Sequence, residues 1–169
     1  LRAGLDSRGL SGVQIVAPES SNNDSALNDR LDALYNDATA WSNITGIASH
    51  SYGMAPGNSQ EARKRDKQFW MTEASENGHE PAEDEDTACT ILARFLNDVN
   101  HSVDRWIYFI GYFPENNVVT ESGSPDSKTK LLSYDLATSS IFVHLKYYYF
   151  LQALNTIDPN AVFRRCQSA

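Results

Sequence analysis

Four short apolar segments, separated by helical patterns, constrain the fold of this chain more than any other feature. Strands that alternate with helices predict a parallel sheet covered by helices. The segments are almost continuously apolar, as expected for strands buried on both faces. The four predicted strands are Val13–Ala17, which Pro18 stops, Ile44–Ser49, Gln68–Thr72 and Arg105–Phe113.

The segments between the strands have the apolar spacing of amphipathic helices. In the first, leucines recur at helical spacing after an N-cap at Asp24 or Ser25. The charged segment Gln60–Asp66 predicts a short second helix. The third has the clearest apolar face, formed by Ala88, Ile91, Leu92, Phe95, Leu96 and Val99.

Four strand–helix units are half of an eight-fold (β/α)8 barrel, which takes about 250 residues. The chain has 169 residues and begins without Met, so we expect a piece of a longer protein. We predict an α/β fold in which residues 1–169 are the C-terminal half of a TIM barrel, strands five to eight. An open half exposes parallel sheet edges, so the remaining half of the barrel is the expected partner. A small complete doubly wound domain is the alternative, although no Gly-rich phosphate loop follows the first strand.

The pattern changes after Pro114. We predict that residues 115–144 are a loop and hairpin inserted before the last helix, with Leu131–Tyr134 pairing with Ile141–His144. A Tyr-rich helix over Leu145–Ile157 and a strand beginning at Val162–Arg164 complete the expected order.

Composition excludes several classes of partner. The formal net charge is -8 and the pI about 4.9, which argues against nucleic-acid or anionic-membrane partners. No apolar run reaches the ~18 residues of a membrane span. Of the two cysteines, Cys89 is expected to be a buried small apolar residue, and its pairing with Cys166 is not readable. Sequons at Asn23, Asn43 and Asn100 favour an extracellular or secreted location for the parent protein.

The acidic run Glu76–Asp86 raises the question of a calcium site. It lacks the ligand order of an EF-hand, and His79–Glu80 lacks the second His of a zincin helix. Carboxylates before a helix favour its dipole, so we predict a solvated loop. We expect no metal and no cofactor.

Polar and aromatic side chains follow the ends of the predicted strands. Carboxyl ends of parallel barrel strands meet on one face, where such folds place their chemistry. A carboxylate among His, Tyr and aromatic rings is typical of a sugar site. The candidates are Glu19, His50, Tyr52, Glu73, Trp106 and Phe109.

Each candidate has a second interpretation. Glu73 can cap the next helix, Glu19 can line the rim, cap a helix or supply a partner carboxylate, and His50 can be a hydrogen-bonded core histidine. Trp106 and Phe109 are an odd number of residues apart, so a regular strand places them on opposite faces.

Several motifs, in order along nearly the whole chain, resemble those of clan A glycoside hydrolases, closest to glycoside hydrolase family 30 and the neighbouring galactocerebrosidase family 59. Leu1–Leu10 and Val13–Glu19 are similar to the fourth helix and fifth strand. Ile47–Tyr52 resembles the sixth-strand H-x-Y end, and Phe69–Glu73 resembles the seventh-strand W-x-T/S-E motif. The remaining similarities are Arg105–Phe109 to the eighth strand and Lys146–Ala161 to the closing helix.

This resemblance implies a retaining β-glycosidase in the parent protein, acting on a β-linked glycoside, either an oligosaccharide or a glycolipid. It implies Glu73 as the nucleophile, His50 and Tyr52 in the subsite of the cleaved sugar, and Trp106 in its wall. Many relatives have Trp where Phe109 stands, and Asn160 replaces a usual Gly.

The same resemblance places the acid/base carboxylate in an Asn-Glu pair after the fourth strand, upstream of Leu1. This fragment alone is therefore expected to be inactive. A non-catalytic carbohydrate-binding barrel is the competing hypothesis, and the sequence upstream of Leu1 would discriminate between the two.

Overall fold

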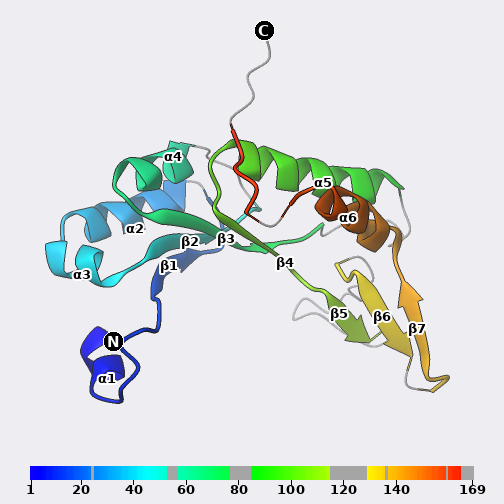
Figure 1. Cartoon of the computed structure of the whole chain (residues 1–169), viewed down its shortest axis with the longest axis horizontal. Coiled ribbons are helices and arrows are strands. Elements are labelled where there is room, and N and C mark those ends of the chain that lie inside the picture. The colour runs from blue at the N-terminus through cyan, green and yellow to red at the C-terminus, as the bar shows by residue number, and fades with distance from the viewer. Residues whose placement is uncertain are drawn as a thin grey trace, which may run out of the picture. The chain divides into compact units, whose positions relative to one another are not determined.

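The computed structural model describes residues 1–23, 25–52, 57–76, 85–114, 129–135, 137–158 and 160–164 (Figure 1). The chain divides into two compact units. Unit 1 comprises residues 1–73 and 101–107, and unit 2 comprises residues 74–100 and 108–169.

A four-stranded sheet, in the order β1-β2-β3-β4, organises unit 1. Both β1–β2 and β2–β3 pair in parallel, which confirms a mixed α/β fold built on a parallel sheet. Gly46 of β2 lies opposite Gln68, where a Cβ atom would come within 2.8 Å of the Gln68 carbonyl oxygen. The strands are β1 (Val16–Ser20), β2 (Gly46–His50), β3 (Gln68–Ala74) and β4 (Arg105–Tyr108).

The first strand begins later than predicted and Pro18 does not stop it. The Arg2 guanidinium donates a hydrogen bond to the Val13 carbonyl. This carbonyl is therefore occupied by a side chain, and the strand starts after it. Pro18 lies inside β1, and β1 is an edge strand of the sheet. An edge strand tolerates proline, because its missing N–H is not needed by a second neighbour.

Short helices accompany this sheet. Of the three leucines predicted as the apolar face of the first helix, Leu27 and Leu31 are buried in α2 and Leu34 is half-buried. This helix packs against β1. The helix α3 is not among the predicted helices, and Asp37 caps it by accepting from the N–H groups of Thr39 and Ala40. The helices of unit 1 are α1 (Arg2–Asp6), α2 (Ser25–Tyr35), α3 (Ala38–Asn43) and α4 (Gly57–Lys64).

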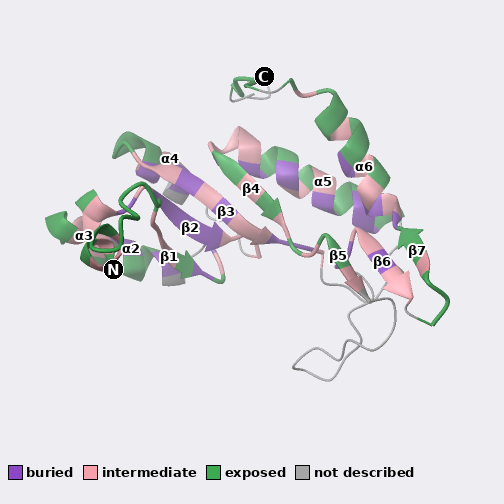
Figure 2. Cartoon of the chain, turned by 60° about the horizontal axis from the view of Figure 1, so that its bottom comes forward, coloured by how far each residue is buried: buried purple, intermediate pink, exposed green. Residues whose placement is uncertain are grey.

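The core of unit 1 includes consecutive residues of β2 and alternate residues of the first part of β3. Ile47, Phe69 and Met71 are fully buried, whereas Trp70 is only half-buried (Figure 2). Each fully buried apolar side chain contributes roughly 1.5–3 kcal/mol. One face of β3 therefore serves the core, and the other remains available for polar and aromatic groups.

In the described residues of unit 2 there are two helices and a second, three-stranded sheet in the order β5-β6-β7. β6 and β7 form the predicted antiparallel hairpin, with Leu132 opposite Val143. The elements are α5 (Glu85–Asn100), β5 (Tyr112–Pro114), β6 (Leu132–Asp135), β7 (Ser140–Val143) and α6 (Leu145–Asn155). Phe95 of α5 and Tyr108 both pack edge-to-face on Phe150 of α6.

Three predictions for this region are wrong. The strand predicted over Arg105–Phe113 is two strands, because the carbonyls of Ile110 and Gly111 accept from the N–H groups of residues 131 and 132 and β5 then pairs in the second sheet. Val162–Arg164 forms no strand. Cys89 is exposed rather than buried, because it lies on the outer side of α5, next to the buried Ala88.

Other predictions fall outside the described residues, namely the Asp24 cap, most of the acidic run Glu76–Asp86, residues 115–128 of the predicted insertion, and Cys166. Asn23 is fully buried, so a glycan at that sequon is incompatible with the folded unit. Among the helices of the described ranges, none is both long enough and apolar enough to cross a membrane.

Candidate active site

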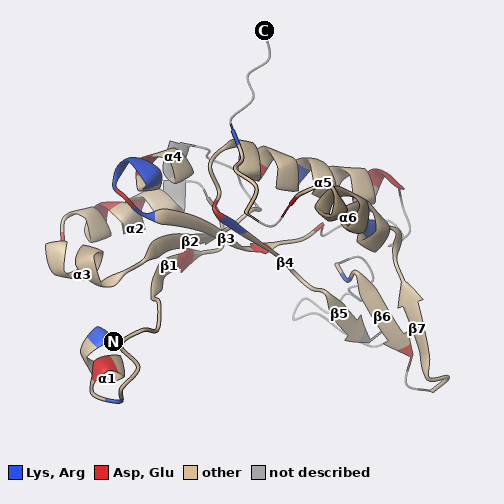
Figure 3. Ribbon diagram, viewed as in Figure 1, with Lys and Arg blue, Asp and Glu red and all other residues tan. Residues whose placement is uncertain are grey.

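Four of the predicted site residues meet at the carboxyl ends of β1, β2 and β3 in unit 1. His50 Nε2 lies 2.9 Å from Glu19 Oε1, and its Nδ1 lies 3.7 Å from Glu73 Oε1. The Tyr52 hydroxyl donates to Glu73 Oε1 at 2.8 Å. Figure 3 shows the acidic residues of β1 and β3 in red. The structure therefore brings together four of the residues predicted at strand ends, namely Glu19, His50, Tyr52 and Glu73.

Glu19 occupies a bulge in β1. Pro18 pairs with Ala48 and Ser20 with Ser49, so Glu19 is an extra residue without a partner in β2. Its φ of 61° lies in the left-handed region, which costs a non-glycine residue about 1–3 kcal/mol. Bulges of this kind re-aim a side chain at a strand end. Here the bulge coincides with the contact between Glu19 and His50.

A second bulge, in β3, brings Glu73 opposite His50. Ser49 pairs with Met71 and His50 pairs with Glu73, so Thr72 is the extra residue. Without this insertion, alternation would place Glu73 on the same face as the buried Met71. The shift instead puts Glu73 beside His50, with its side chain 28% exposed.

Thr72 is a site residue that the sequence did not reveal. Its hydroxyl donates to Glu19 Oε1 and also lies 3.3 Å from the Ser49 carbonyl oxygen. The extra residues of the two bulges thus bind each other across β2. The only signal in the sequence was its place directly before Glu73.

Tyr52 and His50 hold Glu73 through the same carboxylate oxygen. Tyr52 and His50 both approach Oε1, and the His50 and Tyr52 rings meet edge-to-face at 5.9 Å. A carboxylate positioned in this way through Oε1 can present Oε2 to an electrophilic carbon.

Trp106 lies in β4, the fourth strand of the same sheet. Arg105 lies over the ring of Trp70, with its guanidinium carbon 4.3 Å from the ring centre. Because side chains alternate along β4, Trp106 lies on the face opposite Arg105. A role for Trp106 in a sugar-binding wall stays a prediction.

Phe109 belongs to unit 2, where it follows the end of β4. Its side chain is exposed, and its N–H donates to the Ala74 carbonyl at 2.9 Å. Its predicted part in substrate binding stays a prediction.

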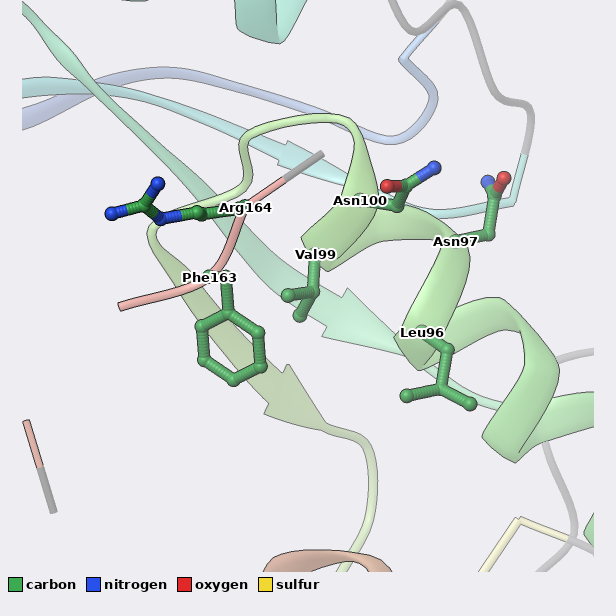
Figure 4. Close-up of a pocket in the computed structure, with 6 residues that line it drawn as sticks. All are labelled: Leu96, Asn97, Val99, Asn100, Phe163 and Arg164. Atoms are coloured by element: carbon green, nitrogen blue, oxygen red, sulfur yellow. The ribbon is translucent and has the colours of Figure 1, made fainter. Parts of the chain in front are cut away.

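A pocket of about 400 Å³ lies within unit 2, between the end of α5 and the segment 160–164 (Figure 4). Its lining includes the apolar side chains of Leu96, Val99 and Phe163. None of the residues predicted to carry chemistry lines it.

In the described ranges, His, Cys, Asp and Glu side chains form no group of three or more suited to a metal ion.

Comparison with known proteins finds similarity in structure only. No protein-family model and no curated protein sequence matches the chain. Similar solved structures include SrfJ from Salmonella typhimurium, with a TM-score of 0.73, 17% identity and coverage of 94% of this chain and 36% of SrfJ. The endo-β1,6-glucanase BT3312 gives a TM-score of 0.64 and 17% identity, over 92% of this chain and 36% of the glucanase.

A glycoside hydrolase family 30 subfamily 8 xylanase from Clostridium acetobutylicum gives a TM-score of 0.56 and 24% identity, over 90% of this chain and 34% of the xylanase. The chain thus spans about a third of the length of these neighbours. Identities this low establish likeness of fold alone. The fold of this chain is similar to part of the fold of these glycoside hydrolases.

Proposed function

We propose that this chain is the C-terminal half of the catalytic barrel of a retaining β-glycosidase, with Glu73 as the nucleophile. The observation that carries the proposal is the environment of Glu73, which lies at a strand end with Tyr52 bonded to it and His50 beside it. The similarity in fold to a glucanase and to family 30 xylanases supports a carbohydrate substrate.

In the proposed reaction, an acid/base carboxyl group outside this chain protonates the leaving oxygen while Glu73 Oε2 attacks the anomeric carbon. The C–O bond to the leaving group breaks as the glycosyl–Glu73 ester forms. Water, deprotonated by the same acid/base group, then releases the sugar with its original configuration. Tyr52 keeps Oε1 in place through both steps, and the hydroxyl bond helps to orient the carboxylate.

Glu19 is the second carboxylate near the site, but its surroundings fit the acid/base role poorly. Its Oε1 contacts His50 and Thr72, both of which are donors to it. An acid/base group must approach the glycosidic oxygen. We therefore place that group in the other half of the barrel.

The test is the substitution Glu73→Gln in the full-length protein that contains this chain, assayed on a panel of aryl β-glycosides. We expect kcat to fall by at least about 10⁴-fold, since removing a nucleophile leaves only binding and charge stabilisation. Glu61→Gln is the matched control, because Glu61 is a partly exposed carboxylate on α4 that pairs with Lys64 and Arg65.

Hydrolysis by the Glu73→Gln variant at close to the normal rate would reject the proposal. If the unaltered full-length protein binds oligosaccharides but hydrolyses no member of the panel, the non-catalytic carbohydrate-binding barrel replaces it.

A further inference from the structure

We propose that Glu19 is a positioning residue, which holds the His50 ring against Glu73 and does not itself bind the sugar. This inference rests on the proposed function, because it assigns Glu19 a part in the reaction of Glu73. It replaces the expectation that Glu19 lines the substrate-binding rim.

The first support is that Glu19 Oε1 is already occupied. It accepts from the Thr72 hydroxyl and lies 2.9 Å from His50 Nε2. A carboxylate oxygen has two lone-pair sites, and these two protein donors fill them. A sugar hydroxyl would have to displace one of the contacts in order to bind the same oxygen.

The second support is the geometry of His50, whose two ring nitrogens face two different carboxylates. Nε2 contacts Glu19 and Nδ1 faces Glu73 Oε1 at 3.7 Å. The 3.7 Å separation is too long for a hydrogen bond, so Glu73 does not fix the ring. Rotation about the outer torsion of histidine is soft, and the contact with Glu19 therefore sets the ring orientation.

The third support is the backbone at Glu19. A bulge with a φ of 61° would suit glycine best, yet a glutamate stands there. The side chain of Glu19 is 48% exposed, so it gains little from burial. The two contacts that cross from β1 to β2 and β3 account for a side chain at this position.

The kinetic test compares Glu19→Ala, Glu19→Gln and Glu61→Gln in the full-length protein on its best aryl β-glycoside. Glu19→Ala should lower kcat about 10- to 100-fold and leave KM within about 3-fold. The reason is that the His50 ring would be displaced from Glu73, and a misplaced ring at the reacting group affects the reaction more than substrate binding. Glu19→Gln keeps an acceptor oxygen and should retain kcat within about 5-fold of the unaltered protein. Glu61→Gln should change neither parameter.

Thr72→Val tests the same contact with a variant that should still fold, since it removes one hydroxyl from a side chain of nearly the same shape. It should lower kcat by about 3- to 10-fold, because Glu19 then loses one of its two donors. Circular dichroism of each variant checks that the fold is kept.

A second measurement does not depend on hydrolysis. The imidazole ¹⁵N–¹H spectrum should show the His50 hydrogen on Nε2, and Glu19→Ala should change the His50 signals while Glu61→Gln leaves them unchanged. A His50 spectrum that is the same with and without the Glu19 carboxylate would overturn the positioning role.

Two kinetic outcomes would also overturn it. A rise in KM at constant kcat would make Glu19 a sugar ligand, and equal inactivation by Glu19→Ala and Glu19→Gln would make it an acid/base group. Failure of the proposed function gives a different result, namely an active Glu73→Gln variant, whatever the Glu19 variants do.

Discussion

The two ends of the sheet in unit 1 differ in what their side chains do. At the amino ends of β2 and β3, aromatic rings and cations pack on one another without any unusual backbone at the contacting residues. At the carboxyl ends, carboxylates face a histidine across two bulges. Under the proposed function, the amino end of this sheet serves stability and the carboxyl end serves chemistry, as in barrel enzymes generally.

The amino end is an aromatic cluster of Tyr35, Trp41, Arg65 and Lys67. The Tyr35 and Trp41 rings pack edge-to-face at 5.1 Å, and the Arg65 guanidinium lies 3.9 Å from the Tyr35 ring centre. Lys67 lies over Trp41 and its ammonium group donates to the Ile44 carbonyl. Burial raises the pKa of Tyr35, while the nearby Arg65 charge acts in the opposite direction.

A left-handed φ occurs at both ends, at Glu19 and at Asp66 just before β3, but only the carboxyl end also gathers carboxylates around a histidine. Glu19 adopts a left-handed φ, and Glu73 and Glu19 bring two carboxylates to one histidine. Strained backbone and clustered charge reduce stability and are retained where the geometry serves function. Substitutions at the two ends should therefore separate activity from stability.

Tyr52→Phe should give the larger effect and act on activity. It removes the hydroxyl that donates to Glu73 Oε1, a hydrogen bond to a charged group worth about 1.5–3 kcal/mol. We expect kcat for aryl β-glycosides to fall about 10- to 100-fold in the full-length protein. The thermal midpoint should change little, and an unchanged kcat would place the hydroxyl outside the reaction.

Trp41→Ala should give a smaller effect and act on stability. It removes the packing with Tyr35 and the cation contact from Lys67, for a loss of about 1–2 kcal/mol in the free energy of unfolding. Urea denaturation measures this loss, and kcat below the unfolding transition should be unchanged.

Tyr35→Phe is the control for this prediction. The Tyr35 hydroxyl is buried and has no hydrogen-bond partner among the described residues, so its removal should leave stability unchanged or slightly raised. A large loss of kcat in Trp41→Ala, with the fold intact, would contradict the claim that the amino end of the sheet affects stability and not activity.

The positions of His50, Tyr52 and Glu73 were predictable because each follows an apolar strand. Parallel strands bring their carboxyl ends together, so order along the chain was enough to place these side chains at one edge. The same reasoning placed Glu19 there, although its role as a partner of His50 was not foreseen.

The two bulges were not predictable. Their effect depends on the register between strands, and register arises from contacts distant in sequence. A left-handed φ is also associated with glycine or asparagine, so a glutamate at position 19 does not indicate a bulge. The sequence pattern therefore predicts Thr72 as the end of a regular strand rather than as an inserted residue.

Errors elsewhere have local physical causes. Pro18 was treated as a strand stop because its place at the sheet edge was unknown. The helix α3 has a sequence signal that was overlooked, the capping Asp37 before Thr39 and Ala40. The prediction that Trp106 and Phe109 face opposite ways applies to a regular strand, and it stays a prediction because β4 ends at Tyr108, before Phe109.

Covalent trapping tests the central claim most directly. The full-length protein is incubated with an activated 2-deoxy-2-fluoro glycoside of its best substrate sugar, which slows release of a glycosyl-enzyme intermediate more than its formation. Mass spectrometry of the digested protein should then find one glycosyl adduct on Glu73, as expected for a carboxylate nucleophile in a retaining reaction. An adduct on another residue, or turnover of the substrate with no adduct on Glu73, would contradict the account.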